Sequence, residues 1–161
     1  MPSIRQTFLL IALACVGAMT AALWLQHHQG LEPCPLCIFQ RVAVIGVGVL
    51  TLLTALCNPA GVMRRIGAAA VALTALGGLG VAGRHVWLQH LPPDEVPACG
   101  PGLDYWIQAL PWQQVLREVF HGSGECARVD WTLLGLSLPE LDLIFLGGVF
   151  VLSCWLLLRR R

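Results

Sequence analysis

The stretch PCPLCIFQR at residues 33–41 holds the side chains best suited to chemistry. Cys34 and Cys37 are separated by two residues, a spacing typical of dithiols that exchange with disulfides. The prolines favour extended backbone before them, so a helix should begin around residues 35–36, with Cys37 in its first turn. Unpaired backbone N–H groups and the helix dipole stabilise a thiolate there. Arg41 should lie one turn further on, on the same face, where its cation can hold that anion.

The composition indicates what kind of chain surrounds this dithiol. Of the 161 residues, 57% are hydrophobic and 12% are charged, and the mean hydropathy is +0.72. A soluble domain usually carries about 25% charged residues, so the composition indicates an integral membrane protein. The length suits a single domain, residues 1–161. A net charge of +1, with no basic patch outside the chain end, argues against nucleic-acid binding.

Four apolar stretches predict four membrane-spanning helices. No charged residue stands between Arg5 and Glu32, and further charge-free runs cover residues 42–63, 66–83 and 143–158. About 20 apolar residues in a helix cross the ~30 Å of bilayer hydrocarbon. We therefore expect an all-α membrane protein, a four-helix bundle with helices at about 8–26, 36–57, 65–89 and 138–158. A cleaved signal peptide is the alternative for the first stretch, but the apolar run continues too far.

The charges predict how the bundle is oriented. The chain has no lysine, and its N-terminus, second connection and C-terminus, which four helices place on one side, carry Arg5, Arg64, Arg65, Arg159, Arg160 and Arg161. The positive-inside rule makes that side, with both termini, cytoplasmic. All nine acidic residues, from Glu32 to Asp142, fall on the opposite side. Two extracytoplasmic loops are therefore expected, at about 27–35 and about 90–137.

The seven cysteines divide into two groups. Three lie within or at the ends of the expected helices and should behave as small apolar residues: Cys15, Cys57 and Cys154. The other four lie in the outward loops, Cys34 and Cys37 in the first, Cys99 and Cys126 in the second. An oxidising compartment favours disulfides there, which indicates two redox pairs, with inert structural disulfides as the alternative. A zinc site of four thiolates fits poorly, because 26 residues separate Cys99 from Cys126, and we expect no metal.

Arg41 stands inside the margin of a membrane helix, where a charge is costly unless it faces the protein interior or an interface. The alternative is that its side chain extends to the lipid head groups. A Cys37 thiolate beside this cation lies within reach of a lipid-soluble electron acceptor, and a membrane quinone fits that description. His85 and His90, near the outer end of the third helix, are further candidates for contact with a quinone.

The second loop should present its cysteines in different settings. Residues 91–102, LPPDEVPACGPG, are rich in proline and glycine, so Cys99 should lie on a mobile, extended stretch that can meet a partner protein. Residues 103–122 mix aromatic and polar side chains and favour a short helix along the membrane interface. GLGVAG at residues 78–83 matches the glycine pattern of a nucleotide-binding motif. Inside an apolar run, however, these small residues are better explained by close packing between helices.

These features together resemble the disulfide bond formation protein B (DsbB) family, which are bacterial inner-membrane thiol:quinone oxidoreductases. PCPLCIFQR resembles the first-loop dithiol of the family and its following arginine. SGECARVDWTLLGLSLPE, residues 123–140, resembles the segment around the last loop cysteine. A closely spaced cysteine pair is a weak signal alone. Together with the arginine, four spans and a second outward cysteine pair it is a specific combination, and the resemblance covers nearly the whole chain.

The resemblance implies a path for electrons. A reduced periplasmic thioredoxin-like oxidase (DsbA) would attack Cys99, and Cys126 would be its partner thiol, able to pair transiently with Cys34. Cys37 would then face ubiquinone, or another membrane quinone, with Arg41 beside the ring. The family thus implies Cys34–Cys37 as the quinone-facing disulfide and Cys99–Cys126 as the partner-facing disulfide.

Two departures and two competing functions accompany this resemblance. Gln40 stands where some members carry an acid, and GRHVWLQH at residues 83–90 does not align cleanly, so the choice between the two histidines stays open. A reductive transporter of thiol electrons would need paired cysteines within the membrane core, which the spacing does not provide. A membrane scaffold with inert disulfides would keep its outer loops permanently bridged.

Overall fold

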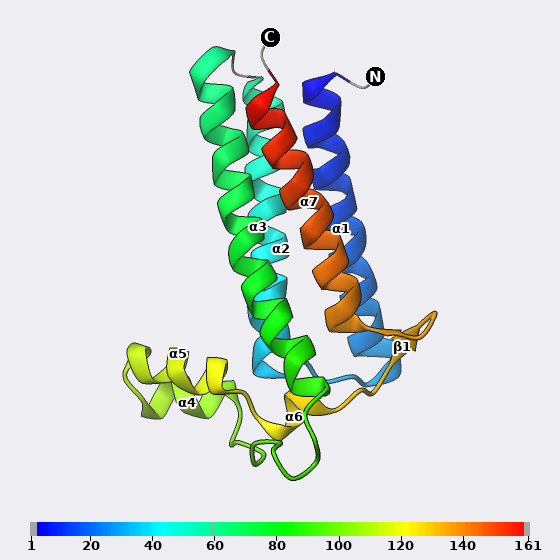
Figure 1. Ribbon diagram of the computed structural model, residues 1–161, viewed down its shortest axis with the longest axis vertical. Coiled ribbons are helices and arrows are strands. Elements are labelled where there is room, and N and C mark those ends of the chain that lie inside the picture. Colours follow the sequence, from blue (N-terminus) through cyan, green and yellow to red (C-terminus); the bar gives the residue numbers. More distant parts are fainter. Residues whose placement is uncertain (1–2, 59, 160–161) are drawn as a thin grey trace.

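The computed structural model describes residues 3–58 and 60–159. Four long helices stand side by side: α1 (Ile4–Gln29), α2 (Pro35–Cys57), α3 (Gly61–Gln89) and α7 (Leu138–Leu158). Each is long and apolar enough to cross a membrane, which confirms the expected four-helix membrane bundle. The start of α1, the connection from α2 to α3 and the end of α7 lie at the same end of the bundle (Figure 1). Arg160 and Arg161, expected at this end, fall outside the described residues.

Two of the long helices begin earlier than the apolar runs predicted. α1 starts at Ile4 because the backbone N–H of Ser3 donates to Gln6 at 2.7 Å and the N–H of Gln6 donates back to the Ser3 hydroxyl at 3.2 Å. This reciprocal cap satisfies two N–H groups that a helix start leaves free. α3 starts at Gly61, so the arginines before its apolar run belong to its first turns. Arginine is a good helix former, and polarity alone does not end a helix.

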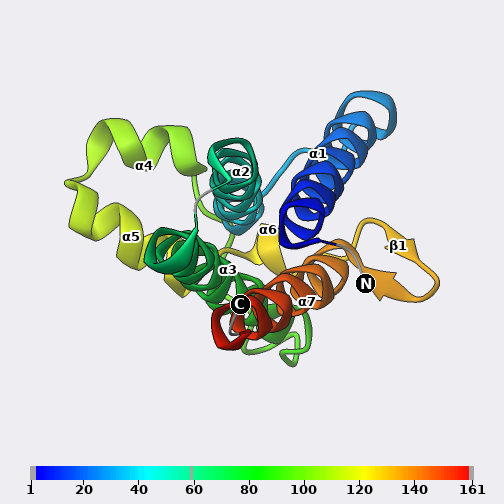
Figure 2. The same ribbon diagram turned by 90° about the horizontal axis from the view of Figure 1, so that it is seen from above.

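Close packing brings α3 against both α2 and α7, while α1 packs on α2 (Figure 2). Gly78 of α3 shows how closely the helices approach, because a Cβ there would lie 2.7 Å from Leu146 and 2.9 Å from Ala43. Only glycine leaves room for both neighbours. GLGVAG therefore serves helix packing, as expected. The core along the bundle includes Phe8, Ile11, Val47, Val71 and Leu146, all at most 5% exposed.

The second connection between long helices folds into several short elements at the opposite end (Figure 1). These are α4 (Leu103–Ala109), α5 (Trp112–His121), α6 (Gly124–Ala127) and an antiparallel pair, β1 (Thr132–Leu133) and β2 (Leu136–Ser137). The sequence predicted one short helix where α4 and α5 stand. The break falls at Leu110, whose backbone is extended (φ −120°, ψ 148°) because Pro111 follows it.

The short helices are fastened to the end of the bundle. Arg84 of α3 donates to the carbonyls of Phe120 at 2.9 Å and His121 at 2.8 Å, at the carboxyl end of α5. Val115 and Val119 of α5 are 1% exposed and belong to a second core that also contains Cys34, Leu36, Leu88 and Cys126. α5 and α6 are therefore held over the start of α2, where the dithiol lies.

Candidate functional site

The dithiol stands at the start of α2, as expected from the sequence. Cys34 is the residue before the first helical turn (φ −66°, ψ 164°), and Pro35 follows as the first helical residue. The Cys34 sulfur accepts the backbone N–H of Cys37 at 3.3 Å, and the two sulfurs are 3.0 Å apart. No disulfide joins any of the seven cysteines in this structure, and the two disulfide pairings stay predictions.

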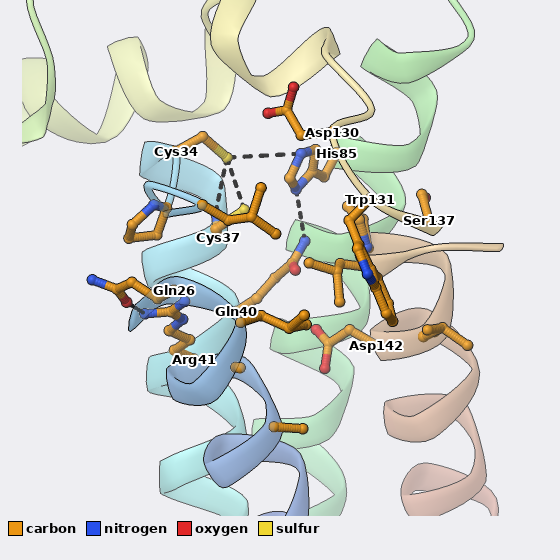
Figure 3. Close-up of a pocket in the computed structure, with 18 of the residues that line it drawn as sticks. Gln26, Cys34, Cys37, Gln40, Arg41, His85, Asp130, Trp131, Ser137 and Asp142 are labelled. Atoms are coloured by element: carbon orange, nitrogen blue, oxygen red, sulfur yellow. Dashed lines mark hydrogen bonds between the residues drawn. The ribbon is translucent and has the colours of Figure 1, made fainter. Parts of the chain in front are cut away.

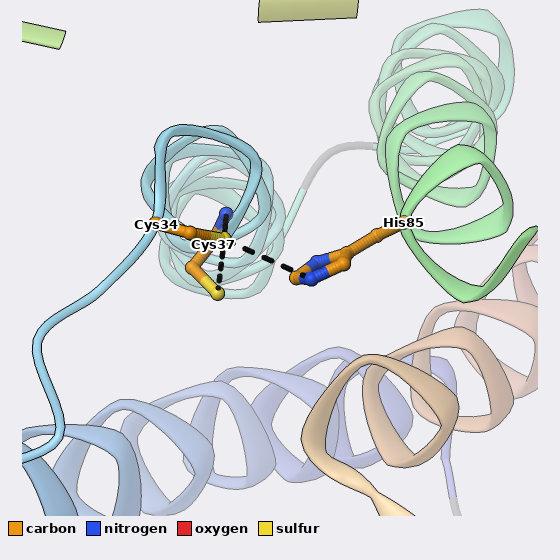
Figure 4. A group of neighbouring side chains, drawn as sticks. All are labelled: Cys34, Cys37 and His85. Atoms are coloured by element: carbon orange, nitrogen blue, oxygen red, sulfur yellow. Dashed lines mark hydrogen bonds between the residues drawn. The ribbon is translucent and has the colours of Figure 1, made fainter. Parts of the chain in front are cut away.

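A histidine completes this cluster (Figure 4). His85 of α3 is 2% exposed, and its Nε2 lies 3.7 Å from the Cys34 sulfur. Its Nδ1 lies 3.1 Å from the amide nitrogen of Gln40, which can only donate. The neutral ring therefore accepts at Nδ1 and carries its proton at Nε2, facing the sulfur. His90, the other histidine considered from the sequence, is exposed and bonds to the Val86 carbonyl at 2.8 Å.

Cys126 is fully buried beside the start of α2. Its sulfur is hydrogen-bonded by the Cys34 thiol and by the backbone N–H of Leu36, and Ser123 Oγ lies 3.7 Å away. The bond from Cys34 lowers the pKa of Cys126 to about 6, although burial opposes the shift. The same bond, together with the one to Cys37, raises the pKa of Cys34. The Cys34 thiol has a single proton, and the Cys37 sulfur at 3.0 Å is also an acceptor for it, so Cys34 can donate to only one of these two sulfurs at a time.

Cys99 lies close to Cys126 in space but in a different setting. It is exposed, on a segment of turns and bends between α3 and α4. The N–H of Gly124 donates to the Ala98 carbonyl at 3.3 Å, which docks this segment on α6. A Cβ on Gly124 would lie 2.9 Å from the Pro97 carbonyl and 3.1 Å from the Cys99 sulfur, so only glycine permits this approach. An exposed cysteine is thus held against the short helix that carries Cys126.

A cavity of about 370 Å³ opens beside the dithiol, inside the bundle end (Figure 3). Its polar lining includes Cys37, Gln40, Arg41 and His85, and its apolar walls include Ala18, Ala22, Leu25, Val44 and Phe145. Volumes of about 300–1,000 Å³ with mostly apolar walls are typical of small-molecule sites. A flat apolar molecule with a few polar atoms could therefore bind within reach of the sulfurs.

Arg41 lines this cavity, but it does not bond to a sulfur. Its Nη1 donates to the amide oxygen of Gln26 in α1 at 2.5 Å. The guanidinium expected beside Cys37 therefore lies with Gln26, because an acceptor from the neighbouring helix satisfies a cation that burial would otherwise leave unpaired. The ionisable group next to the sulfurs is instead the imidazole of His85.

The sequence reasoning did not place Asp142, Gln26 and Trp131 at the site, and all three line the cavity. The helix expected at residues 138–158 contains Asp142, which does lie within α7, but no role was inferred for its carboxyl group. A carboxylate inside a membrane-spanning helix is itself a signal of a functional position. Gln26 carried a weaker signal, as a polar residue at the end of an apolar run.

The cluster of Cys34, Cys37 and His85 could also hold a metal ion, since its three ligand atoms lie within 4.8 Å of one another. Thiolate and imidazole ligands suit zinc. Such an ion would compete with disulfide formation, because each sulfur can serve only one of the two roles. The expectation that the protein uses no metal stays a prediction.

The chain is similar to known proteins of one family. A family model described as "Disulfide bond formation protein DsbB" matches residues 4–156. The chain is 52% identical over 151 residues to disulfide bond formation protein B of Acinetobacter baumannii, covering 93% of this chain and 88% of the relative. It is 50% identical to the protein of that name from Methylococcus capsulatus, covering 96% of each chain. The relative from Chromobacterium violaceum is 48% identical, covering 98% of this chain and 95% of the relative.

Proposed function

The chain belongs to the disulfide bond formation protein DsbB family, and from this premise we propose that it passes electrons from a reduced periplasmic DsbA-like thiol oxidase to a membrane quinone. A role in disulfide formation by an integral membrane protein follows from the family and the four apolar helices. What we propose beyond this role is the electron donor, the electron acceptor and the residues that connect them.

One observation carries the proposal: three sulfurs form a connected series that ends at the cavity. Cys126 is hydrogen-bonded to Cys34, whose sulfur lies 3.0 Å from that of Cys37. Cys37 and His85 line the cavity, whereas Cys99 stands at the exposed beginning of the series. A permanent structural disulfide needs no such continuity between exposed and buried thiols. Exchange of disulfides along a route requires it.

The first half of the cycle opens both disulfides of the oxidised chain by thiol–disulfide exchange. A thiolate of the reduced partner attacks the Cys99 sulfur, the Cys99–Cys126 bond breaks, and Cys126 leaves as a thiolate. The Cys126 thiolate attacks Cys34, which forms a Cys34–Cys126 bond and releases Cys37 as a thiolate. Attack on Cys34 fits the hydrogen bond that already joins these two residues.

The second half restores the starting state. The second thiol of the partner resolves its mixed disulfide with Cys99, so the partner leaves oxidised and Cys99 is a thiolate. Cys99 attacks Cys126, which re-forms Cys99–Cys126 and frees Cys34. Cys34 and Cys37 then join as a disulfide and give up two electrons. In sum, a partner dithiol becomes a disulfide and the acceptor gains two electrons and two protons.

Ubiquinone, or another membrane quinone, would supply the two-electron sink. The residues present fit such a group, because the cavity is large enough for a quinone ring and combines apolar walls with Gln40, Arg41 and His85 as polar contacts. Of these, Arg41 donates from the side of α1 and α2, and His85 stands between the cavity and the sulfurs. The deeper part of the cavity lies between helices that lipid would surround.

The orientation of the chain follows from the same arrangement. We place the sulfurs at the outer, periplasmic face of the bacterial inner membrane, where the partner is found, and both termini in the cytoplasm. The arginines at the other end of the bundle support this, since Arg5, Arg64, Arg65 and Arg159 gather where α1 begins and α7 ends.

Anaerobic mixing of the purified protein, a reduced DsbA-like partner and ubiquinone tests the function. We expect one quinone to be reduced for each partner disulfide formed, followed by quinone absorbance and thiol trapping. Cys37→Ser and Cys126→Ser should abolish the reaction, because each breaks the series of sulfurs. Cys154→Ser, in α7 and away from the cavity lining, is the matched control and should react at the wild-type rate.

Three results would contradict the proposal. Full turnover by Cys37→Ser would exclude the route assigned here. Disulfides that stay oxidised when the reduced partner is added would identify a scaffold with inert bridges. Loss of activity after treatment with a zinc chelator would show that a metal at Cys34, Cys37 and His85 is part of the working site.

A further inference from the structure

Asp142 is an acidic side chain inside a membrane-spanning helix. It lies one turn into α7, and its Oδ2 is buried with no hydrogen-bond partner among the described residues. A carboxylate in such a place is costly unless it is paired or protonated. The position therefore calls for a function of the carboxyl group itself.

The carboxyl group belongs to the same cavity as the sulfurs. Figure 3 shows the Asp142 carboxylate pointing from α7 into the cavity that Cys37 of α2 and His85 of α3 also line. It is close enough to both of these groups to interact with them electrostatically. The other charged or titratable side chains of the lining are Glu32, Cys34, Arg41, Glu125, Arg128 and Asp130.

These other groups are already engaged or, like Glu32 and Glu125, exposed. Arg41 donates to Gln26, and Arg128 pairs with Asp130 at 3.2 Å, with both side chains at least half exposed. The Nδ1 of His85 accepts from Gln40, while its Nε2 faces the Cys34 sulfur. His85 can therefore exchange a proton with one sulfur. Asp142 is the lining carboxyl group with a free, buried oxygen.

The proposed reaction needs such a group. Closing the Cys34–Cys37 disulfide releases two electrons, and the acceptor needs two protons as well, which a Cys37 thiolate cannot supply. Electrons can cross an apolar cavity directly, but protons need groups that bind and release them. The His85 side of the cavity has one such group, whereas the α7 side has Asp142.

We propose that Asp142 is the proton-transfer residue of the cavity, which rests on the function proposed above. Because Cys37 enters this step as a thiolate, the protonated carboxyl group gives its own proton to an oxygen of the reduced acceptor and regains one from the aqueous side, where the partner thiols release theirs, while the imidazole of His85 transfers the proton of Cys34. The carboxyl group is unchanged after each cycle, so the balance of two electrons and two protons is kept. The class of acceptor that this arrangement suits is a quinone, whose oxygens must be protonated as it is reduced.

The test uses the full-length protein with Asp142→Asn, which keeps the size and polarity of the side chain but cannot exchange a proton. Asp142→Glu is the conservative variant, and Glu118→Gln, an exposed residue of α5 outside the cavity, is the matched control. Infrared difference spectra between the dithiol and disulfide states, with diamide as the oxidant, report the carboxyl group without any quinone. Single-turnover reduction of ubiquinone gives the rate, and acid quenching measures the Cys126–Cys34 exchange separately.

The inference predicts a carboxyl band in the wild-type difference spectrum that disappears in Asp142→Asn and persists, shifted, in Asp142→Glu. Quinol formation should slow about 100-fold in Asp142→Asn, the usual contribution of one proton-transfer group, and recover in Asp142→Glu. The Cys126–Cys34 exchange should be unchanged in both variants. A difference spectrum unaffected by Asp142→Asn, or a wild-type rate in that variant, would overturn the inference. If wild-type protein reduces no quinone, the proposed function fails, and the infrared band still decides the role of Asp142.

Discussion

The sulfurs of Cys34 and Cys126 are neighbours, and their pKa values are shifted in opposite directions. Their hydrogen bond lowers the pKa of Cys126 to about 6 and raises the pKa of Cys34. A thiolate is the attacking species in disulfide exchange, and in the proposed cycle Cys126 attacks the sulfur of Cys34. The backbone N–H of Leu36 also lowers the pKa of Cys126. A free N–H group at the start of α2 therefore stabilises the thiolate of a cysteine from the second loop.

This difference predicts a pH dependence for the reduced protein. Because the pKa of Cys126 is lowered by folding, its contribution to stability is complete above the unfolded value of about 8.5 and is lost as the pH falls through about 6. Thiolate absorbance in the ultraviolet should therefore show a step near pH 6. Cys126→Ser should remove that part of the signal, and Cys34→Ala should move it to higher pH by removing the donor.

Cys154→Ser serves as the control, because that residue lies far along α7 from the donor pair. A titration in which Cys126→Ser leaves the thiolate signal intact would show that Cys126 is an ordinary protonated thiol. The direction of exchange between the two loops would then need another cause.

The cysteines and Arg41 could be found from the sequence because residue type and spacing carry the signal. Their contacts could not be found in this way. Spacing along one helix puts Arg41 one turn from Cys37, but Gln26 of another helix decides where the guanidinium points. His85 and Asp142 reach the cavity from helices far apart in the sequence, so their meeting depends on the packing of α2, α3 and α7.

At the scale of helices, the position of His85 depends on how α3 packs against its neighbours. Gly78 lies two turns before His85, where α3 contacts Ala43 of α2 and Leu146 of α7. Small residues allow helices in a membrane to approach closely, because packing replaces the missing hydrophobic driving force. The sequence indicated that glycines of α3 serve packing. It could not tell that Gly78 makes the contact while Gly77 does not.

Gly78→Ala should therefore destabilise the bundle. The added Cβ would lie 2.9 Å from the Cβ of Ala43, which cannot move without its backbone, and 2.7 Å from Leu146. Overpacking of this kind costs about 1–3 kcal/mol, which outweighs the higher helix propensity of alanine. The free energy of unfolding in detergent measures the effect.

Gly77→Ala is the matched control for this substitution, since a Cβ at that position meets nothing within 4 Å. It should leave stability unchanged or slightly higher. Equal stabilities for the two variants would mean that α2, α3 and α7 do not approach as closely as the structure shows.

The split of the second loop into α4 and α5 was predictable in part. Pro111 marks a break that the sequence displays, and the amphipathic pattern on either side favours helix. The docking of α5 through Arg84 depends on a contact between residues 36 and 37 positions apart, which no local pattern reveals. Local rules thus give the elements of this loop, and long-range contacts give its position over Cys126.

At the scale of the whole molecule, the two ends of the bundle differ in chemistry. One end carries the arginines and the connection from α2 to α3, and the other carries the sulfurs, the short helices and the β1–β2 pair (Figure 1). This polarity could be predicted from the order of charged and apolar segments, because four consecutive spans fix which connections share a side. Which end faces the cytoplasm belongs to the proposed function and needs its own test.

Two exposed cysteines provide that test. Cys57 ends α2 at the arginine-bearing end, and Cys99 lies in the segment between α3 and α4 at the other end. In spheroplasts with an intact inner membrane, a membrane-impermeant maleimide should label Cys99 after reduction and should not label Cys57. Labelling of Cys57 should appear only when the membrane is opened. Variants that keep one of these two cysteines and replace the other by serine separate the signals. Cys57 labelled from outside, with Cys99 protected, would put the sulfurs in the cytoplasm, where reductants would oppose disulfide formation.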